Sequence, residues 1–268
     1  MNISATQFDL GNARACARAS ADAYQRATIS IPETDTHCLI AETPDCFVIA
    51  FRGTTSIRNW ITDAEFERNW IATDLQGSTC DVHDGFLNAF ESALPQLSKF
   101  LGGSPVMKIQ NCKPLFITGH SLGGALAILA ALELQRAGFQ VAQVYTFGQP
   151  RVGNTAFKRL YESSLGQCTF RVVYQEDIVP RVPHLPAWHD PYRHVGTEVF
   201  ISSVAGDLWF NPPLLRLLAS DIWGIYRAFI VSKFAGALDP ILDHHVNNYI
   251  TALSKAAPIP QSELQTPK

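Results

Sequence analysis

Ser121 lies in a sequence setting that is typical of a nucleophile. It is the central residue of Gly119-His120-Ser121-Leu122-Gly123, between the apolar run 115–118 and a helical pattern over 122–137. At such a turn the hydroxyl stands clear of the sheet. Glycine is needed two residues before and after because side chains there would meet backbone. The helix N-terminus then faces any anion formed at the serine, so the pattern predicts a catalytic serine rather than an ordinary Gly-rich turn.

A serine hydroxyl needs a general base, which an acidic residue orients. In chains with this type of turn, the acid follows the serine and the histidine follows the acid. Asp177 comes shortly after the apolar run 169–174, where a parallel sheet presents side chains at its strand ends, and it opens a segment with two prolines. We therefore predict Asp177 as the acid, and we interpret Glu176 as a solvated loop charge.

The order rule leaves several candidates for the base. The histidines that follow the serine are His184, His189, His194, His244 and His245. The last two follow Asp243 and lead into the final expected helix, so the residues favour this pair without choosing between its members.

Apolar periodicity predicts the elements that position these residues. Unbroken apolar runs indicate strands covered on both faces, and stripes at helical spacing indicate helices. The expected strands are 46–51, 115–118, 141–147 and 169–174, and the expected helices are 8–26, 86–101, 122–137 and 157–165. Because strands and helices alternate, we predict an α/β domain with a largely parallel sheet. The apolar region 207–238 is expected to add one or two helices that cover the sheet or line an acyl pocket.

Composition narrows the functional classes. The chain has 268 residues, 47% of them hydrophobic, and a formal charge of −3, so there is no basic surplus to bind nucleic acid. No apolar run approaches the length of a membrane span, and the N-terminus does not have the pattern of a signal peptide. The six cysteines form no Cys-x-x-Cys pair, and buried thiols are favoured over three disulfides. One domain over 1–256, with a frayed tail over 257–268, accounts for the chain.

In addition to the serine motif, five motifs in order resemble the class 3 lipase family, the fungal-type triacylglycerol lipases. They are Phe51-Arg52-Gly53-Thr54-Thr55-Ser56-Ile57-Arg58-Asn59-Trp60, His83-Asp84-Gly85-Phe86, Thr146-Phe147-Gly148-Gln149-Pro150-Arg151-Val152-Gly153-Asn154, Asp177-Ile178-Val179-Pro180-Arg181 and Asp243-His244. The resemblance implies the α/β-hydrolase fold, with helices on both faces of a mostly parallel central sheet and a helical lid. It also implies that no metal or cofactor takes part.

Carried over by position, the resemblance implies a role for each of five residues. Ser121 would be the nucleophile, Asp177 the acid and His244 the base. Thr54 and Leu122 would donate hydrogen bonds to the oxyanion. The positions of Arg151 and His194 fall in motifs whose matching residues are structural in the family, and we expect His194 to be a buried, hydrogen-bonded histidine.

A lid is expected at residues 55–70. Ile57, Trp60 and Ile61 fall on one side of an amphipathic pattern that begins three residues after Thr54. An ordinary surface helix would have the same pattern. Next to the oxyanion loop, however, it favours a lid that hides its apolar face in water and opens at a lipid–water interface.

The resulting hypothesis is a carboxylic-ester hydrolase, a triacylglycerol lipase that acts on acylglycerols or other lipid esters. The same motifs also suit a phospholipase A1 or a feruloyl or short-chain esterase. A remote alternative is an inactive hydrolase fold that binds lipid. Acyl-chain preference, oligomeric state and cellular location are not predicted.

Overall fold

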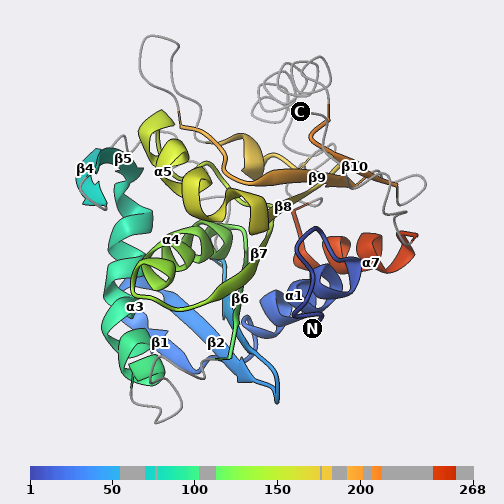
Figure 1. Cartoon of the computed structure of the whole chain (residues 1–268), viewed down its shortest axis with the longest axis horizontal. Coiled ribbons are helices and arrows are strands. Elements are labelled where there is room, and N and C mark those ends of the chain that lie inside the picture. Colours follow the sequence, from blue (N-terminus) through green and yellow to red (C-terminus); the bar gives the residue numbers. More distant parts are fainter. Residues whose placement is uncertain are drawn as a thin grey trace, which may run out of the picture.

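The fold is seen in a computed structural model of the chain (Figure 1). The structure describes residues 1–54, 70–75, 78–102, 113–175, 177–182, 192–201, 207–212 and 244–257. Within these residues an eight-stranded sheet forms the centre, in the order β1 (Ile29–Ile31), β2 (Thr36–Glu42), β3 (Phe47–Phe51), β6 (Leu115–His120), β7 (Val141–Phe147), β8 (Thr169–Tyr174), β9 (Thr197–Ile201) and β10 (Leu208–Phe210). A separate antiparallel pair consists of β4 (Trp70–Leu75) and β5 (Ser78–His83).

Five helices accompany the strands in the described part of the chain. They are α1 (Leu10–Asp22), α3 (Asp84–Gly102), α4 (Leu122–Arg136), α5 (Thr155–Leu165) and α7 (Val246–Lys255). Three short 3₁₀ turns lie at Pro32–Thr34, Gly166–Cys168 and Val179–Arg181.

The middle of the sheet is parallel, as the apolar runs predict. The pairings from β3 through β6, β7 and β8 to β9 are all parallel, whereas β1, β2 and β10 pair antiparallel toward the edges. Every residue of β3 and β6 is buried, as expected for strands covered on both faces. The carboxyl ends of β6, β7 and β8 therefore meet at one edge, where side chains from three segments can converge.

Helices cover both faces of this sheet, as expected for an α/β-hydrolase fold (Figure 1). One core cluster joins side chains of α3, α4 and α5 to residues of β3, β6 and β7. A second cluster joins α1 and α7 to residues of β7, β8 and β9 on the other face. The sheet is thus sandwiched between two apolar layers, which fix its edge as a rigid platform.

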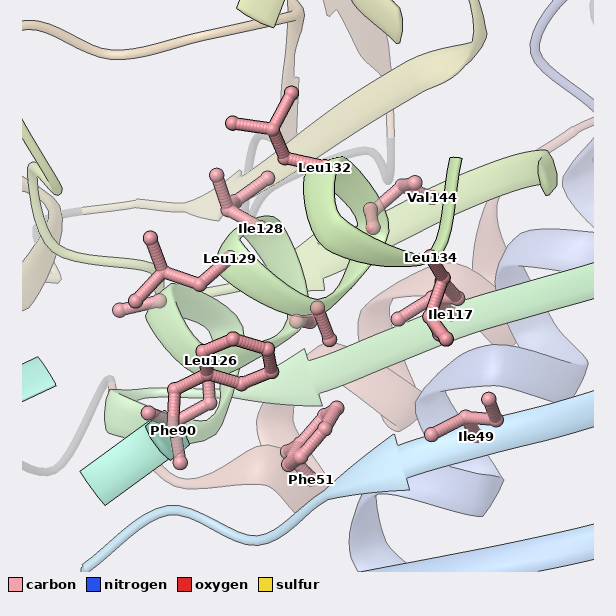
Figure 2. Close-up of a cluster of buried hydrophobic side chains, with 14 of the residues drawn as sticks. Ile49, Phe51, Phe90, Ile117, Leu126, Ile128, Leu129, Leu132, Leu134 and Val144 are labelled. Atoms are coloured by element: carbon pink, nitrogen blue, oxygen red, sulfur yellow. The ribbon is translucent and has the colours of Figure 1, made fainter. Parts of the chain in front are cut away.

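Helix α4 is apolar on nearly every side, which explains its place in the core. Its buried residues run from Gly123 to Leu132 without a break, and Leu134 adds to them. Figure 2 shows Leu126, Ile128 and Leu129 of this helix packed above Ile49 and Ile117 and other side chains of the sheet. A helix that is apolar all round is stable only when it is buried, so the N-terminal end of α4 is held firmly at the sheet edge.

The first and last described helices lie against each other (Figure 1). The Arg14 side chain of α1 donates through Nε to the carbonyl oxygen of Leu253 at 2.9 Å and through Nη2 to that of Ala256 at 2.9 Å. These bonds satisfy carbonyl groups at the C-terminus of α7, where no helical partner is available. Helix α1 thereby anchors the last described element of the chain.

One expected element is wrong where the structure describes it. Residues 208–210 form the edge strand β10 rather than part of a helix, because a short apolar run has no periodicity that separates the two structures. Residues 213–238 lie outside the described residues. The same holds for 55–69 of the expected lid, whose final position, Trp70, begins β4. Residues 258–268 of the expected tail also lie outside, and the single domain over 1–256 stays a prediction.

The described residues contain five cysteines, and those at 16, 38, 46 and 168 are free thiols. Those at 16, 38, 46 and 80 are buried and Cys168 is partly exposed, while Cys112 lies outside the described part. Burial is the largest effect on the pKa of the Cys168 thiol, which is raised to about 11. No helix among the described residues is both long enough and apolar enough to cross a bilayer.

Candidate active site

Ser121 occupies a tight turn between β6 and α4. Its backbone has φ 61° and ψ −132°, an unusual conformation for a residue other than glycine. A Cβ at Gly119 would fall 2.0 Å from the carbonyl oxygen of Gly123, and one at Gly123 would fall 2.2 Å from that of Phe51. Both glycines are therefore required by contact with backbone, as the sequence predicts.

The Ser121 side chain sits at the N-terminal end of α4, whose first residue is Leu122. The helix dipole therefore places partial positive charge beside the hydroxyl. Ser121 is only 1% exposed, and its Oγ has no hydrogen-bond partner among the described residues. A buried hydroxyl without a partner is costly in a folded protein, and such groups concentrate at functional sites.

Asp177 lies fully buried, just beyond the end of β8. Its carboxylate accepts three kinds of donor. His244 Nδ1 lies 2.8 Å from Oδ2, the Val179 N–H donates to Oδ1 at 2.9 Å, and the Tyr249 hydroxyl donates to Oδ2. A carboxylate held by several donors stays ionised even without water.

Burial and the neighbouring donors have opposite effects on the pKa of Asp177. Burial, the largest single effect, raises the pKa of the carboxyl group. The charge of His244 and the hydrogen bonds from His244, Tyr249 and Val179 oppose burial and together bring the pKa below its ordinary value. The group is therefore a carboxylate at neutral pH.

His244 is the histidine that meets this carboxylate. Because an ionised carboxylate can only accept, Nδ1 of the neutral ring must carry the proton, and Nε2 must bear a lone pair. Nε2 is buried and has no hydrogen-bond partner among the described residues. His245, its neighbour, is exposed at the N-cap of α7, so the structure separates the two residues that the sequence leaves as a pair.

Gly148 provides the space in which this pair meets. It follows β7 with φ 58°, and a Cβ there would fall 2.7 Å from Asp177 Oδ2 and 2.8 Å from His244 Cε1. Contact distances of this kind are too short for a real carbon atom. The glycine in the segment after β7 is thus explained by the Asp177–His244 pair rather than by the turn alone.

The segment after β3 approaches the serine from the other side. A Cβ at Gly53 would fall 2.9 Å from Ser121 Cβ, so the backbone of this segment runs against the turn. Thr54 is the next residue and is partly buried. The structure thus places the segment that contains Thr54, together with the first residue of α4, beside Ser121.

The remaining candidate residues either bond to backbone carbonyl groups or lie outside the described residues. His194 is partly buried and shares a hydrogen bond of 2.6 Å between Nε2 and the carbonyl oxygen of Pro180, as expected for a structural residue. Arg151 also has a backbone partner, since it donates to the carbonyl oxygen of Arg181. The other predicted residues lie outside the described ones: Ile57, Trp60, Ile61, Glu176, His184 and His189.

Tyr249 is a site residue that sequence reasoning does not identify. It is fully buried on α7, and its hydroxyl donates to the Asp177 carboxylate. Its ring packs against His120 with centroids 5.9 Å apart. The only signal in the sequence is its position five residues after His244, in the expected final helix.

Known proteins resemble this chain in sequence. Residues 48–186 match the family described as lipase (class 3). A secreted mono- and diacylglycerol lipase A of Penicillium camembertii is 32% identical over 222 residues, which cover 75% of this chain and 68% of that protein. A lipase of Rhizomucor miehei is 36% identical over 227 residues, 80% of this chain and 56% of that protein. A secreted mono- and diacylglycerol lipase 1 of Fusarium solani is 36% identical, and the match spans 43% of its length.

Solved structures have the same fold. The triacylglyceride lipase of Rhizomucor miehei superposes with a TM-score of 0.57 at 27% identity, covering 72% of this chain and 78% of that one. A triacylglycerol lipase whose catalytic centre is described as a serine protease triad superposes with a TM-score of 0.58 at 28% identity, covering 72% and 80%. With the family match over more than half of its residues, this chain belongs to the class 3 lipase family, serine ester hydrolases of the α/β-hydrolase fold.

Proposed function

We propose that this chain hydrolyses the ester bonds of acylglycerols through an acyl-enzyme intermediate on Ser121. The observation that carries the proposal is the buried His244–Asp177 pair, with Nδ1 of the ring bonded to the carboxylate at 2.8 Å and Nε2 left open. The ring lies beside the serine turn, with its centroid 4.5 Å from that of His120. An oriented imidazole with an open lone pair is the base that a serine nucleophile needs.

In the proposed reaction, His244 Nε2 takes the hydroxyl proton as Ser121 Oγ attacks the ester carbonyl carbon. The resulting oxyanion accepts hydrogen bonds from the backbone amides of Thr54 and Leu122, and one such donor is typically worth about 3 kcal/mol. His244 then gives the proton to the leaving glyceryl oxygen, and the acyl group remains on Ser121. Water repeats the cycle and releases the fatty acid.

Asp177 holds the ring of His244 and stabilises its charge after the proton is taken. The Val179 amide and the Tyr249 hydroxyl keep the carboxylate ionised in a site without exposure to solvent. Without this carboxylate the ring could adopt the other tautomer, which has no lone pair on Nε2. The positions of Asp177 just after β8 and of His244 just before α7 support this role.

Acylglycerols are the proposed substrate class because the relatives of this chain are named as lipases that act on mono-, di- and triacylglycerols. The amphipathic pattern at Ile57, Trp60 and Ile61 supports action at a lipid–water interface. Such a pattern gives the open state an apolar partner at an oil surface, so the two states differ in their contacts with lipid.

The test compares purified chain with its Ser121→Ala variant on emulsified mono-, di- and triglycerides, p-nitrophenyl esters of rising chain length, and a phospholipid. We expect release of fatty acid from the glycerides and a loss of at least about 10⁴-fold in the variant. The rate should rise once the ester exceeds its solubility. Hydrolysis of phospholipid or short aromatic esters alone would replace the substrate class, and turnover by Ser121→Ala would overturn the proposed nucleophile.

A further inference from the structure

A second line of hydrogen bonds, separate from those to Asp177, crosses the site. The Tyr24 hydroxyl, just beyond the end of α1, lies 2.9 Å from His120 Nδ1. At the other side of the same ring, Nε2 lies 2.5 Å from the main-chain carbonyl oxygen of His244. His120 is 4% exposed, so these bonds are shielded from water.

The direction of each bond follows from the groups involved. A carbonyl oxygen can only accept, so His120 must donate to His244 from Nε2. In the neutral ring Nδ1 is then an acceptor, and the Tyr24 hydroxyl must donate to it. Burial, and after it the charge of His244, lower the pKa of His120 to about 3, so the ring stays neutral at neutral pH. His120 therefore does not compete with His244 for the proton taken from Ser121.

The same tyrosine also meets the segment that leads to Thr54. Gly53 lies directly against the Tyr24 hydroxyl, since a Cβ on Gly53 would fall 2.4 Å from that oxygen. Two hydrogen bonds therefore run in line, from Tyr24 to His120 and from His120 to the backbone of His244, and Gly53 lies against the hydroxyl where the line begins. The His120 ring accepts one of these bonds and donates the other, an arrangement in which neighbouring bonds strengthen each other.

We infer that Tyr24 and His120 are positioning residues, which hold the oxyanion segment and the backbone of the base in register across Ser121. This inference rests on the proposed function. The carboxylate of Asp177 sets the orientation of the His244 ring, whereas the Tyr24–His120 line sets where its backbone lies relative to Gly53–Thr54. Catalysis is sensitive to small displacements of these groups. A shift of about 1 Å at reacting atoms can cost about 100-fold in rate.

The chain offers a matched control on the same two elements. Ser20 and Thr118 are both fully buried, and their hydroxyl oxygens lie 3.0 Å apart. Ser20 is one turn before Tyr24, and Thr118 is two residues before His120 on β6. This bond ties α1 to β6 as the Tyr24–His120 bond does, but neither residue touches Gly53 or His244 in any described contact.

The experiment measures Tyr24→Phe, His120→Leu, His120→Gln, the double variant of the first two, and Ser20→Ala. Active sites are counted by fluorophosphonate titration, and kcat and KM per titrated site are measured on a soluble p-nitrophenyl ester. Affinity for an alkyl boronic acid reports the tetrahedral state. The unaltered chain and Ser121→Ala, run in parallel, test the proposed function separately from the variants.

We expect Tyr24→Phe and His120→Leu to lower kcat per titrated site by about 10- to 100-fold with KM nearly unchanged, and to weaken boronic acid binding in parallel. The kcat of the double variant should equal that of the less active single variant, because either change breaks the same line of hydrogen bonds. His120→Gln should recover most activity, since an amide offers a donor and an acceptor side by side.

Ser20→Ala should lose stability but keep kcat per titrated site. The inference is overturned if Tyr24→Phe, which removes a single oxygen atom, keeps the kcat per titrated site and the boronic acid affinity of an active unaltered chain. An equal loss in Ser20→Ala would overturn it too, because the effect would then belong to the packing of α1 in general. Failure of the unaltered chain to turn over any ester would instead refute the proposed function.

Discussion

At the scale of single residues, Gly148 shows how a catalytic pair can depend on an atom that is missing. We predict that Gly148→Ala lowers kcat by about 100-fold or more, because its methyl group would overlap Asp177 Oδ2 and His244 Cε1 and push the pair apart. Ester turnover per mole of folded protein measures the effect. Gly138→Ala is the control, since Gly138 also has positive φ, at 89°, but nothing within 4 Å of its Cβ position. Equal activity loss in both variants would assign the effect to backbone strain.

Tyr249 provides a second test at this scale. Tyr249→Phe removes one donor from the buried Asp177 carboxylate, and we expect it to lower kcat/KM by about 10-fold, since a hydrogen bond to a charged group contributes about 1.5–3 kcal/mol. Tyr161→Phe is the matched control. Its hydroxyl is also fully buried and lies 2.9 Å from Thr169 Oγ1, away from the site. The control should lose stability while its kcat/KM stays unchanged; a similar loss of activity there would refute a specific role for Tyr249.

At the scale of elements, the segment between β7 and α5 combines two different functions. Gly148 makes room for the Asp177–His244 pair, whereas Asn154 caps α5 by accepting from the Phe157 N–H at 3.0 Å. Asn154 also donates to Asp81 at 3.1 Å and so ties α5 to β5. The motif is therefore partly catalytic and partly a helix start.

We predict that Asn154→Ala lowers the free energy of unfolding by about 1–2 kcal/mol and leaves kcat per active site unchanged. Urea unfolding followed by circular dichroism measures the first quantity, and titrated ester turnover the second. Asn154→Ser, which restores a capping oxygen, should recover part of the stability. A loss of kcat in Asn154→Ala would show that the cap also supports the catalytic geometry.

The elements that the sequence predicts well are those whose burial is uniform. Strands at 141–147 and 169–174 have the predicted bounds because nearly all of their residues are buried and most of them are apolar. Short edge strands such as β1 carry three residues and no comparable signal, and β10 was expected to be helical. Edge strands depend on a neighbouring strand for their pairing, which local periodicity does not contain.

The residues of the site also differ in how far the sequence predicts them. The glycines around Ser121 are predictable because their neighbours in the chain impose the steric requirement. The choice between His244 and His245 depends on how the chain enters α7, which buries the first residue and exposes the second. The hydrogen bond from Tyr249 to Asp177 needs two segments 72 residues apart in the chain to meet. Such features arise from tertiary packing, so residue types alone leave them open.

At the scale of the whole molecule, buried histidines connect stability to pH. Burial lowers the pKa of His83 to about 4 and that of His120 to about 3, and it also places the pKa of His194 well below the ordinary value. In the unfolded chain these rings take up protons near pH 6.5. Below that pH the unfolded state binds more protons than the folded one, so stability must fall as the pH is lowered.

We predict that the free energy of unfolding decreases steadily below about pH 6, by about 1.4 kcal/mol per pH unit for each such histidine that the unfolded chain protonates. His83→Phe, which keeps the stacking against Phe86, should remove the share of one ring between about pH 5.5 and 4.5. Chemical denaturation at several pH values measures the slope. An unchanged slope in His83→Phe would show that this ring does not stay neutral in the folded protein.

The contact between α1 and α7 also has a consequence for synthesis on the ribosome. The serine turn is complete once β6, β7 and α4 have emerged, but the imidazole that would activate it arrives only with the last described helix. That helix packs on α1, which is synthesised much earlier and has no such partner until α7 emerges. A nascent chain therefore carries a nucleophile without its base while the segment between β7 and α7 is synthesised, and hydrolytic competence is delayed until α1 and α7 have met.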